Sequence, residues 1–150
     1  MALAKADLRS RTLASGGHLE IKEYDLCLQS DDDTIPSYSK LAQIGQELAS
    51  ARAKVCNVAD PNPLLQHILD EAGFVDIKVR KFKVPTNTWP TDAALQELGK
   101  YRNFDQRMML ESALGDLCRI QGWNEEGARE LVSGAMNELN HRRIHAYHDL

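Results

Sequence analysis

The sequence of 150 residues is long enough for one domain with a single core and short for a two-domain enzyme. Hydrophobic residues make up 43% and charged residues 27%, which is typical of a globular protein and excludes a disordered or membrane-spanning chain. The formal net charge of -4 argues against nucleic acid as a partner, because such a surface needs clustered excess Lys and Arg. We therefore expect a single domain over residues 1–150, with neither nucleic acid nor a membrane as its partner.

The N-terminal residues and the cysteines indicate a cytoplasmic protein. The opening residues are charged and amphipathic and contain no continuous apolar stretch of the kind that a signal peptide has. Cys27, Cys56 and Cys118 are odd in number and far apart, as expected of reduced thiols in an intracellular protein.

A helix and then a strand are predicted at the start of the chain. The helix covers residues 2–14, and the pair Gly16 and Gly17 ends it. Residues 18–28 alternate between apolar and polar side chains, with an irregularity after Glu23, and this alternation predicts a strand.

An acidic turn at residues 31–33 precedes a second predicted helix, from Pro36 to about Lys54. This helix has apolar residues at helical spacing. The acidic run could bind calcium, but it lacks the ligand spacing of a calcium loop, so a solvated turn is the simpler interpretation.

The clearest unit of the chain is a helix followed by a strand in residues 64–84. An apolar stripe predicts a helix that Gly73 ends, because glycine suits the left-handed cap of a helix. Residues 74–84 are β-branched and aromatic at many positions, and from Val75 onward apolar side chains alternate with charged ones until Pro85. The alternation predicts an edge or antiparallel strand with one face in water.

Two helices are predicted in the C-terminal half. Asp92 can cap a long helix with one apolar stripe that includes Leu98 and Tyr101. Gly99 and Gly115 each weaken this helix by roughly 1 kcal/mol relative to Ala, so the helix could be broken in two. A final helix is expected after an asparagine cap, with two glutamates in its first turn, where they favour the helix dipole.

Two strong strands make a poor sheet. An isolated pair is marginal in water and exposes unpaired backbone groups at its edges, so helices or another chain must cover them. The expected fold class is therefore α/β and mostly helical, and we expect the chain to associate with itself or with a partner.

The search for catalytic motifs finds no glycine-rich phosphate loop and no serine nucleophile elbow. His141 and His145 have a spacing that could offer two imidazoles to one metal ion. Arg142 and Arg143 lie between them and would repel a cation, and no third ligand is assigned. A cationic helix end is the simpler interpretation, and we expect no metal.

Glu23, Tyr24 and Asp25 are the candidate catalytic residues. They lie at the carboxyl end of the first predicted strand, where ligands bind in open α/β sheets, and they could serve as a base and an orienting group. A solvated strand end is the alternative. Other side chains could line an apolar substrate pocket between helices, with core packing as the alternative. They are Trp89, Tyr101, Phe104, Met108, Met109 and Trp123.

Several short motifs occur in a fixed order along the chain. They are Ser15-Gly16-Gly17, Glu23-Tyr24-Asp25, Glu71-Ala72-Gly73-Phe74, Trp89-Pro90 and Ile144-His145-Ala146-Tyr147. In this order the chain resembles the C-terminal half of the fungal S-adenosylmethionine-dependent methyltransferases of secondary metabolism, the group that includes the global regulator of those gene clusters. The resemblance implies a partial class I methyltransferase, Rossmann-like, fold with two main strands and a helical lid over residues 89–123.

The resemblance also implies what this chain does not contain. In the family, the glycine-rich cofactor loop and the acidic residue that holds the ribose lie before the point equivalent to the start of this chain. The last strand of the family inserts antiparallel between the fifth and sixth strands, and it should begin at about Leu150. The resemblance therefore implies no cofactor for this chain, and it carries over only Glu23, Tyr24 and Asp25 on the substrate side.

Three functions are consistent with these observations. The chain could bind a small-molecule natural-product intermediate and guide a cofactor-independent cyclisation or isomerisation by holding it near its reactive geometry. It could be a pseudo-methyltransferase that acts as an interaction protein, as a homo-oligomer or with a methyltransferase-like partner, or it could be a fragment with no independent role. A pocket closed by Tyr101, Met108 and Trp123 would favour the enzyme, and a large apolar surface would favour the interaction protein. We favour the small-molecule function, because the lid helices carry aromatic and Met residues that a bare scaffold does not need.

Overall fold

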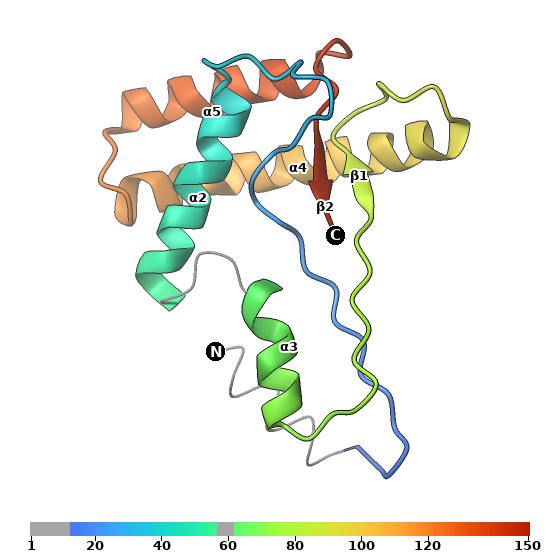
Figure 1. The fold of residues 1–150 in the computed structure, drawn as a ribbon. Helices are drawn as coiled ribbons and strands as arrows, with labels where there is room; N and C mark the ends of the chain where they lie inside the picture. The colour runs from blue at the N-terminus through green and yellow to red at the C-terminus, as the bar shows by residue number, and fades with distance from the viewer. Residues whose placement is uncertain (1–12, 57–61) are drawn as a thin grey trace.

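The computed structural model describes residues 13–56 and 62–150, so the helix predicted over residues 2–14 falls almost entirely outside the described part. The described chain is mostly helical and has two short strands (Figure 1). The elements are α2 (Lys40–Cys56), α3 (Asn62–Glu71), β1 (Lys83–Pro85), α4 (Ala93–Arg119), α5 (Glu125–Leu139) and β2 (Tyr147–Asp149). No described helix is both long and apolar enough to cross a membrane.

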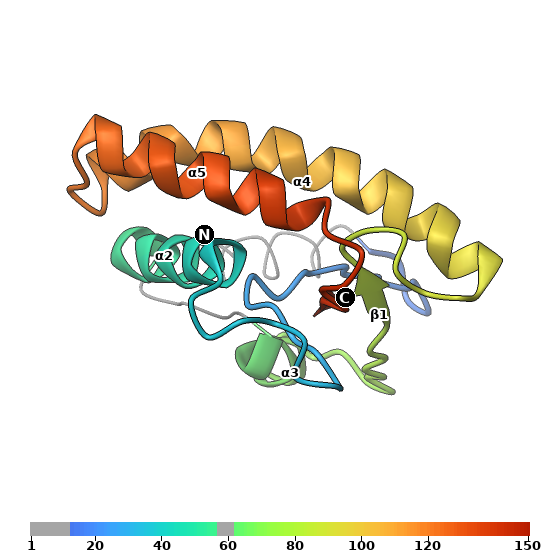
Figure 2. The same ribbon diagram turned by 90° about the horizontal axis from the view of Figure 1, so that it is seen from above.

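Three helices form the core of the molecule. α4 and α5 run antiparallel and side by side, and α2 packs against both (Figure 2). The apolar stripe of α5 and the C-terminal half of α4 face α2, as the helical spacing predicts. The buried cluster consists of Leu41, Ile44, Leu110, Ala113, Leu117, Ala128, Leu131, Val132, Ala135 and Leu139.

The two glycines of α4 do not break it, and the helix is continuous over 27 residues. Its cap is the expected one, because the Asp92 carboxylate accepts a hydrogen bond from the Leu95 amide at 2.9 Å. At Gly99 the helix approaches another backbone segment, since a Cβ atom there would overlap the carbonyl oxygen of Asn87. Gly99 is therefore a point of close contact between helix and loop.

The start of α2 depends on a residue of α5. The helix begins at Lys40 and not at Pro36. The Glu138 carboxylate of α5 accepts hydrogen bonds from the Ser39 hydroxyl at 2.6 Å and from the amides of Lys40 and Leu41 at 2.9 and 3.1 Å. This carboxylate satisfies amides that a helix start leaves without intrahelical partners, so a tertiary contact fixes the boundary.

β2 forms a two-stranded sheet with β1 and has a further backbone partner on its other edge. It pairs antiparallel with β1 along one edge. On its other edge Tyr147 forms a bridge with Gln29, and the Asp25 amide donates a hydrogen bond to the Asp149 carbonyl at 2.9 Å. The end of the chain therefore lies between the two segments that the sequence predicts as strands.

The predicted strands are too long in both cases. Of the predicted strand 74–84 only Lys83 and Val84 lie in a strand, β1. Residues 18–28 are extended or bent, and their bridge to β2 lies just beyond, at Gln29. Their shared partner, β2, has only three residues, so the backbone ladder stops near Leu150. β2 also begins at Tyr147, earlier than the family resemblance implies.

The part of the molecule around α3 is loosely packed. The helix is confirmed, and Gly73 follows it with a φ of 84°, the left-handed conformation expected of its cap. α3 packs against none of the other described helices and strands. Together with residues 18–24 and 77–81 it forms the open half of the molecule, below β2 in Figure 1.

Candidate functional site

The candidate catalytic residues point to three different neighbours. Glu23 accepts a hydrogen bond from Arg52 of α2 at 3.2 Å. The Arg102 guanidinium of α4 lies over the ring of Tyr24, 4.3 Å from its centroid. The carboxylate of the third residue, Asp25, accepts a hydrogen bond from an amide two residues further along the chain. Each side chain is already held by the protein, so the structure does not gather the three around one reaction centre.

The main polar site lies between residues 24–25, β2 and α4, and we call it the His148 cluster: Tyr24, Asp25, Arg102, Gln106 and His148. The Nδ1 atom of His148 lies 2.8 Å from the carbonyl oxygen of Asp25, which can only accept, so Nδ1 carries the proton. In a neutral ring Nε2 then accepts, here from the Gln106 amide nitrogen at 2.5 Å. Both ring nitrogens are occupied.

Three residues of the His148 cluster are almost completely removed from water, whereas Tyr24 and Asp25 are half-buried. His148 is 2% exposed, Gln106 1% and Arg102 7%. Burial, and then the positive charge of Arg102, lower the pKa of His148 from 6.5 to about 4, so the ring is neutral near pH 7. The Nε atom of Arg102 and the Oε1 atom of Gln106 have no hydrogen-bond partner among the described residues. This buried polar layer attaches α4 to the sheet.

The polar layer explains where the aromatic residues of α4 lie. Because Arg102 and Gln106 face the sheet, the apolar stripe in this half of the helix faces outward. Tyr101 is 68% exposed, Phe104 67% and Met108 58%. The prediction that the apolar stripe is buried is therefore wrong for the N-terminal half of α4. The prediction assumed that apolar residues face the core, but in this half the polar residues Arg102 and Gln106 make the contact. These three residues border neither of the two cavities described below.

Trp89 lies at a different place and holds the segment before β2. Its indole nitrogen donates to the Ala146 carbonyl at 2.9 Å, and its ring stacks on His145 with centroids 4.9 Å apart. The Nδ1 atom of His145 lies 2.6 Å from the Asp32 carboxylate, and this hydrogen bond holds the pKa of Asp32 well below its usual value. The acidic turn therefore binds the end of the chain.

The described residues offer no metal site of three or more His, Cys, Asp or Glu side chains. The pair His141 and His145 lies beyond the last helix, which ends at Leu139, and not within its end as the spacing suggests. His145 instead pairs with an aspartate of the acidic turn.

The described glycines do not fit an S-adenosylmethionine loop. Gly16, Gly73 and Gly122 have positive φ, but they lie before an extended segment, after α3 and between α4 and α5. None of these three connects the end of a strand to the start of a helix, where a glycine-rich nucleotide loop lies.

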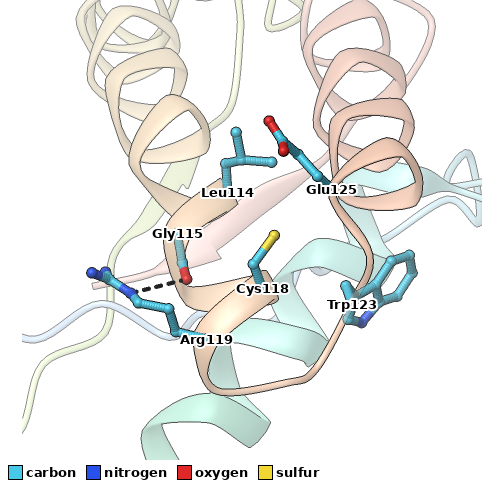
Figure 3. A pocket seen from close by; sticks show the side chains of 6 residues that line it. All are labelled: Leu114, Gly115, Cys118, Arg119, Trp123 and Glu125. Atoms are coloured by element: carbon cyan, nitrogen blue, oxygen red, sulfur yellow. Dashed lines mark hydrogen bonds between the residues drawn. The ribbon is translucent and has the colours of Figure 1, made fainter.

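Two cavities border these elements. The first, about 440 Å³, lies at the turn between α4 and α5 and is lined by Leu114, Gly115, Cys118, Arg119, Trp123 and Glu125 (Figure 3). Of the side chains predicted to line a substrate pocket, Trp123 lines this cavity and Met109 lines the second. The second, about 420 Å³, lies between α2 and α4. Its lining includes Leu26, Leu48, Ala51, Arg52, Val55 and Met109. Sequence reasoning misses the second cavity as a whole, because its walls come from three separate segments.

Comparison with known proteins shows which class of protein the sequence resembles. No family model and no solved structure matches it. Curated proteins that match are methyltransferases and regulators of fungal secondary metabolism, so the resemblance read from the motifs is confirmed.

Individual relatives share about a third of the aligned residues. The chain is 32% identical over 138 residues to Methyltransferase pytC of Aspergillus terreus, covering 91% of this chain and 43% of the relative. It is 32% identical over 136 residues to Secondary metabolism regulator LAE1 of Cochliobolus heterostrophus, covering 89% and 44%. It is 28% identical over 137 residues to Probable methyltransferase tdiE of Emericella nidulans, covering 91% and 43%. The chain spans less than half the length of these relatives.

Proposed function

We propose that the chain is a methyltransferase-like protein of fungal secondary metabolism that works by association. A second copy or a methyltransferase-like partner completes its sheet and covers its apolar surface. This is the interaction function among those consistent with the sequence, and the outward-facing stripe of α4 is the observation that carries the proposal.

The α4 stripe consists of Tyr101, Phe104 and Met108. These residues are three and four positions apart, the spacing that places side chains along one face of a helix and forms the seam between paired helices. All three are more than half exposed. Adjacent large apolar side chains on a surface mark interaction sites, because their burial releases about 25 cal/mol per Å².

The open half of the molecule supports the same proposal. Val75 is 84% exposed, Val79 62% and Phe82 57%. Val75 and Val79 lie before Phe82, the last residue of this segment whose backbone pairs with Leu150, and residues 77–81 have no backbone hydrogen bond to another described residue. The neighbouring helix α3 packs on no other described element. Extended, apolar and unpaired backbone is the surface that pairs with another chain.

The test is the association state in solution. Sedimentation velocity at micromolar concentration should show a dimer, or a complex with an added full-length methyltransferase-like relative. Tyr101→Ser should weaken that association. Tyr38→Ser is the matched control, because Tyr38 is 82% exposed but lies outside the stripe, and it should have no effect.

Two results contradict the proposal. One is a chain that stays monomeric alone and with the relative, and the other is an equal effect of both tyrosine variants. Calorimetry adds an independent check, since micromolar binding of S-adenosylmethionine by the isolated chain would mean that it contains a cofactor site of its own.

A second candidate function is the binding of a small-molecule natural-product intermediate, with a cofactor-independent cyclisation or isomerisation as its reaction. The cavity of about 420 Å³ favours it, since its volume lies in the range of small-ligand sites and Arg52, the partner of Glu23, lies in its wall. A panel of aromatic natural products should then shift the NMR signal of the Met109 methyl group. Ala51→Trp, which fills the cavity, should abolish that shift, and a shift that survives would exclude this function.

A further inference from the structure

We infer that the cavity at the turn between α4 and α5 binds a planar aromatic molecule that carries a hydrogen-bond donor at its edge, such as an indole or a phenol. We call this cavity the turn pocket, and its volume of about 440 Å³ lies in the range of small-ligand sites. The turn pocket shares no lining residue with the cavity between α2 and α4 that the second candidate function uses. The inference therefore goes beyond both functions proposed above.

The inner wall of the turn pocket is apolar and fixed in place. Leu114, Cys118 and Trp123 line it, and all three are half-buried and pack against the buried cluster of the three core helices. Figure 3 shows the sulfur of Cys118 pointing into the space between α4 and α5. A wall that already packs on a core needs no ordering when a ligand binds, so little conformational entropy is lost there.

The turn between the two helices sets the position of the Trp123 ring. Gly122 has a φ of 78°, a left-handed conformation that reverses the chain, and the Trp123 amide donates to the Leu117 carbonyl at 3.0 Å. A Cβ atom at Gly127 would lie 3.6 Å from Cε3 of Trp123, so α5 passes against the edge of the ring. The ring is thus held beside the turn pocket, and its flat apolar surface is one on which an aromatic ligand stacks.

The charged groups at the mouth of the turn pocket favour an uncharged ligand with a donor. Arg119 bonds within its own helix, where Nε donates to the Gly115 carbonyl at 3.2 Å and a terminal nitrogen lies 3.5 Å from Asp116. Glu125 accepts hydrogen bonds from Arg129 through Oε1, whereas its Oε2 atom bonds to no described residue. The group left over is therefore one carboxylate oxygen, which can only accept.

An indole or a phenol matches both features of the turn pocket. Its ring stacks on Trp123, and the N–H or O–H group at its edge donates to Glu125. An aliphatic ligand lacks the stacking, and a carboxylate ligand is repelled by the Glu125 charge.

The probe is free indole, added at millimolar concentration to the intact chain and followed by NMR. The chain has two tryptophans, so it has two side-chain N–H signals. The Trp123 signal should shift, and the signal of Trp89, which donates to the Ala146 carbonyl, should not. Indene has the same shape but no N–H group, and it should bind about fivefold more weakly. Equal binding of indole and indene, or an unchanged Trp123 signal, overturns the inference.

The cysteines locate the ligand independently. Cys118 lines the turn pocket, and Cys56 lines the cavity between α2 and α4. Free indole should slow the alkylation of Cys118 by iodoacetamide, measured by mass spectrometry, and leave that of Cys56 unchanged. Protection of Cys56 alone would place the ligand in the other cavity, which overturns the inference and supports the second candidate function. Equal protection of both cysteines, or of neither, also overturns it.

Two glutamate variants provide a matched pair. Glu125→Ala and Glu126→Ala each remove one exposed negative charge from the first turn of α5, but only Glu125 lines the turn pocket. Glu125→Ala should weaken the binding of indole by about fivefold, the value of one net hydrogen bond, and Glu126→Ala by less than about twofold. Equal losses contradict the inference.

Discussion

The buried histidine of β2 makes the stability of this protein depend on pH. Folded, His148 is neutral because it donates to Asp25, accepts from Gln106 and lies near the Arg102 guanidinium. Unfolded, the same imidazole returns to its ordinary pKa. Acid therefore protonates His148 more readily in the unfolded chain, and protons favour unfolding.

The size of the effect follows from the two pKa values. The pKa of His148 is about 4 in the folded protein, against 6.5 for an ordinary histidine. Each pKa unit corresponds to 1.36 kcal/mol, so the free energy of unfolding falls by about 3 kcal/mol once the pH reaches the folded pKa. The contribution is fully present above pH 6.5 and is lost as the pH falls from 6.5 to about 4. A small domain has a total stability of about 5–15 kcal/mol, so this loss is readily measured.

Urea denaturation at pH 7.5 and pH 4.5 measures the loss, which appears as a lower midpoint at the acid pH with an unchanged slope. His148→Gln is the informative variant, because a glutamine amide can still donate but does not titrate. It should be less stable than the wild type at pH 7.5 and lose much less stability between the two pH values. If the variant and the wild type lose the same stability, or if the NMR signal of His148 titrates near pH 6.5 in the folded protein, the reasoning is refuted.

Two further predictions concern helix packing. Gly99→Ala should destabilise the fold by about 1–2 kcal/mol, because the overlap of the new Cβ atom with the Asn87 carbonyl outweighs the gain in helix propensity. Gly115→Ala should stabilise the fold by up to about 1 kcal/mol, because the Cβ atom there meets only the flexible tip of an arginine side chain. Thermal unfolding of the two variants checks this, and shifts of the same sign would contradict it. Glu138→Ala removes the acceptor of three hydrogen bonds at the start of α2 and should cost about 2 kcal/mol in urea denaturation. Glu126→Ala, exposed at the start of α5, is its control, and a similar loss in both variants would show that Glu138 does not stabilise α2.

Local signals in the sequence determined the helices of the described chain. The cap residues Asp92 and Asn124 and the terminal Gly73 act on amides and carbonyls within one turn, so their effect is visible in the sequence. The apolar stripe of α5 is equally local, because one face of a helix is set by spacing alone. The family resemblance likewise follows from short motifs in a fixed order.

Only the tertiary structure decided which face of α4 is buried and how far the strands extend. Arg102 and Gln106 face the sheet because His148, more than forty residues away in sequence, supplies the partner of Gln106, and no spacing rule encodes that pairing. The strands are short because a strand exists only where a neighbour bonds to it, and β2 supplies three residues. Helices carry their hydrogen bonds within themselves, whereas strands and buried polar contacts depend on distant parts of the chain.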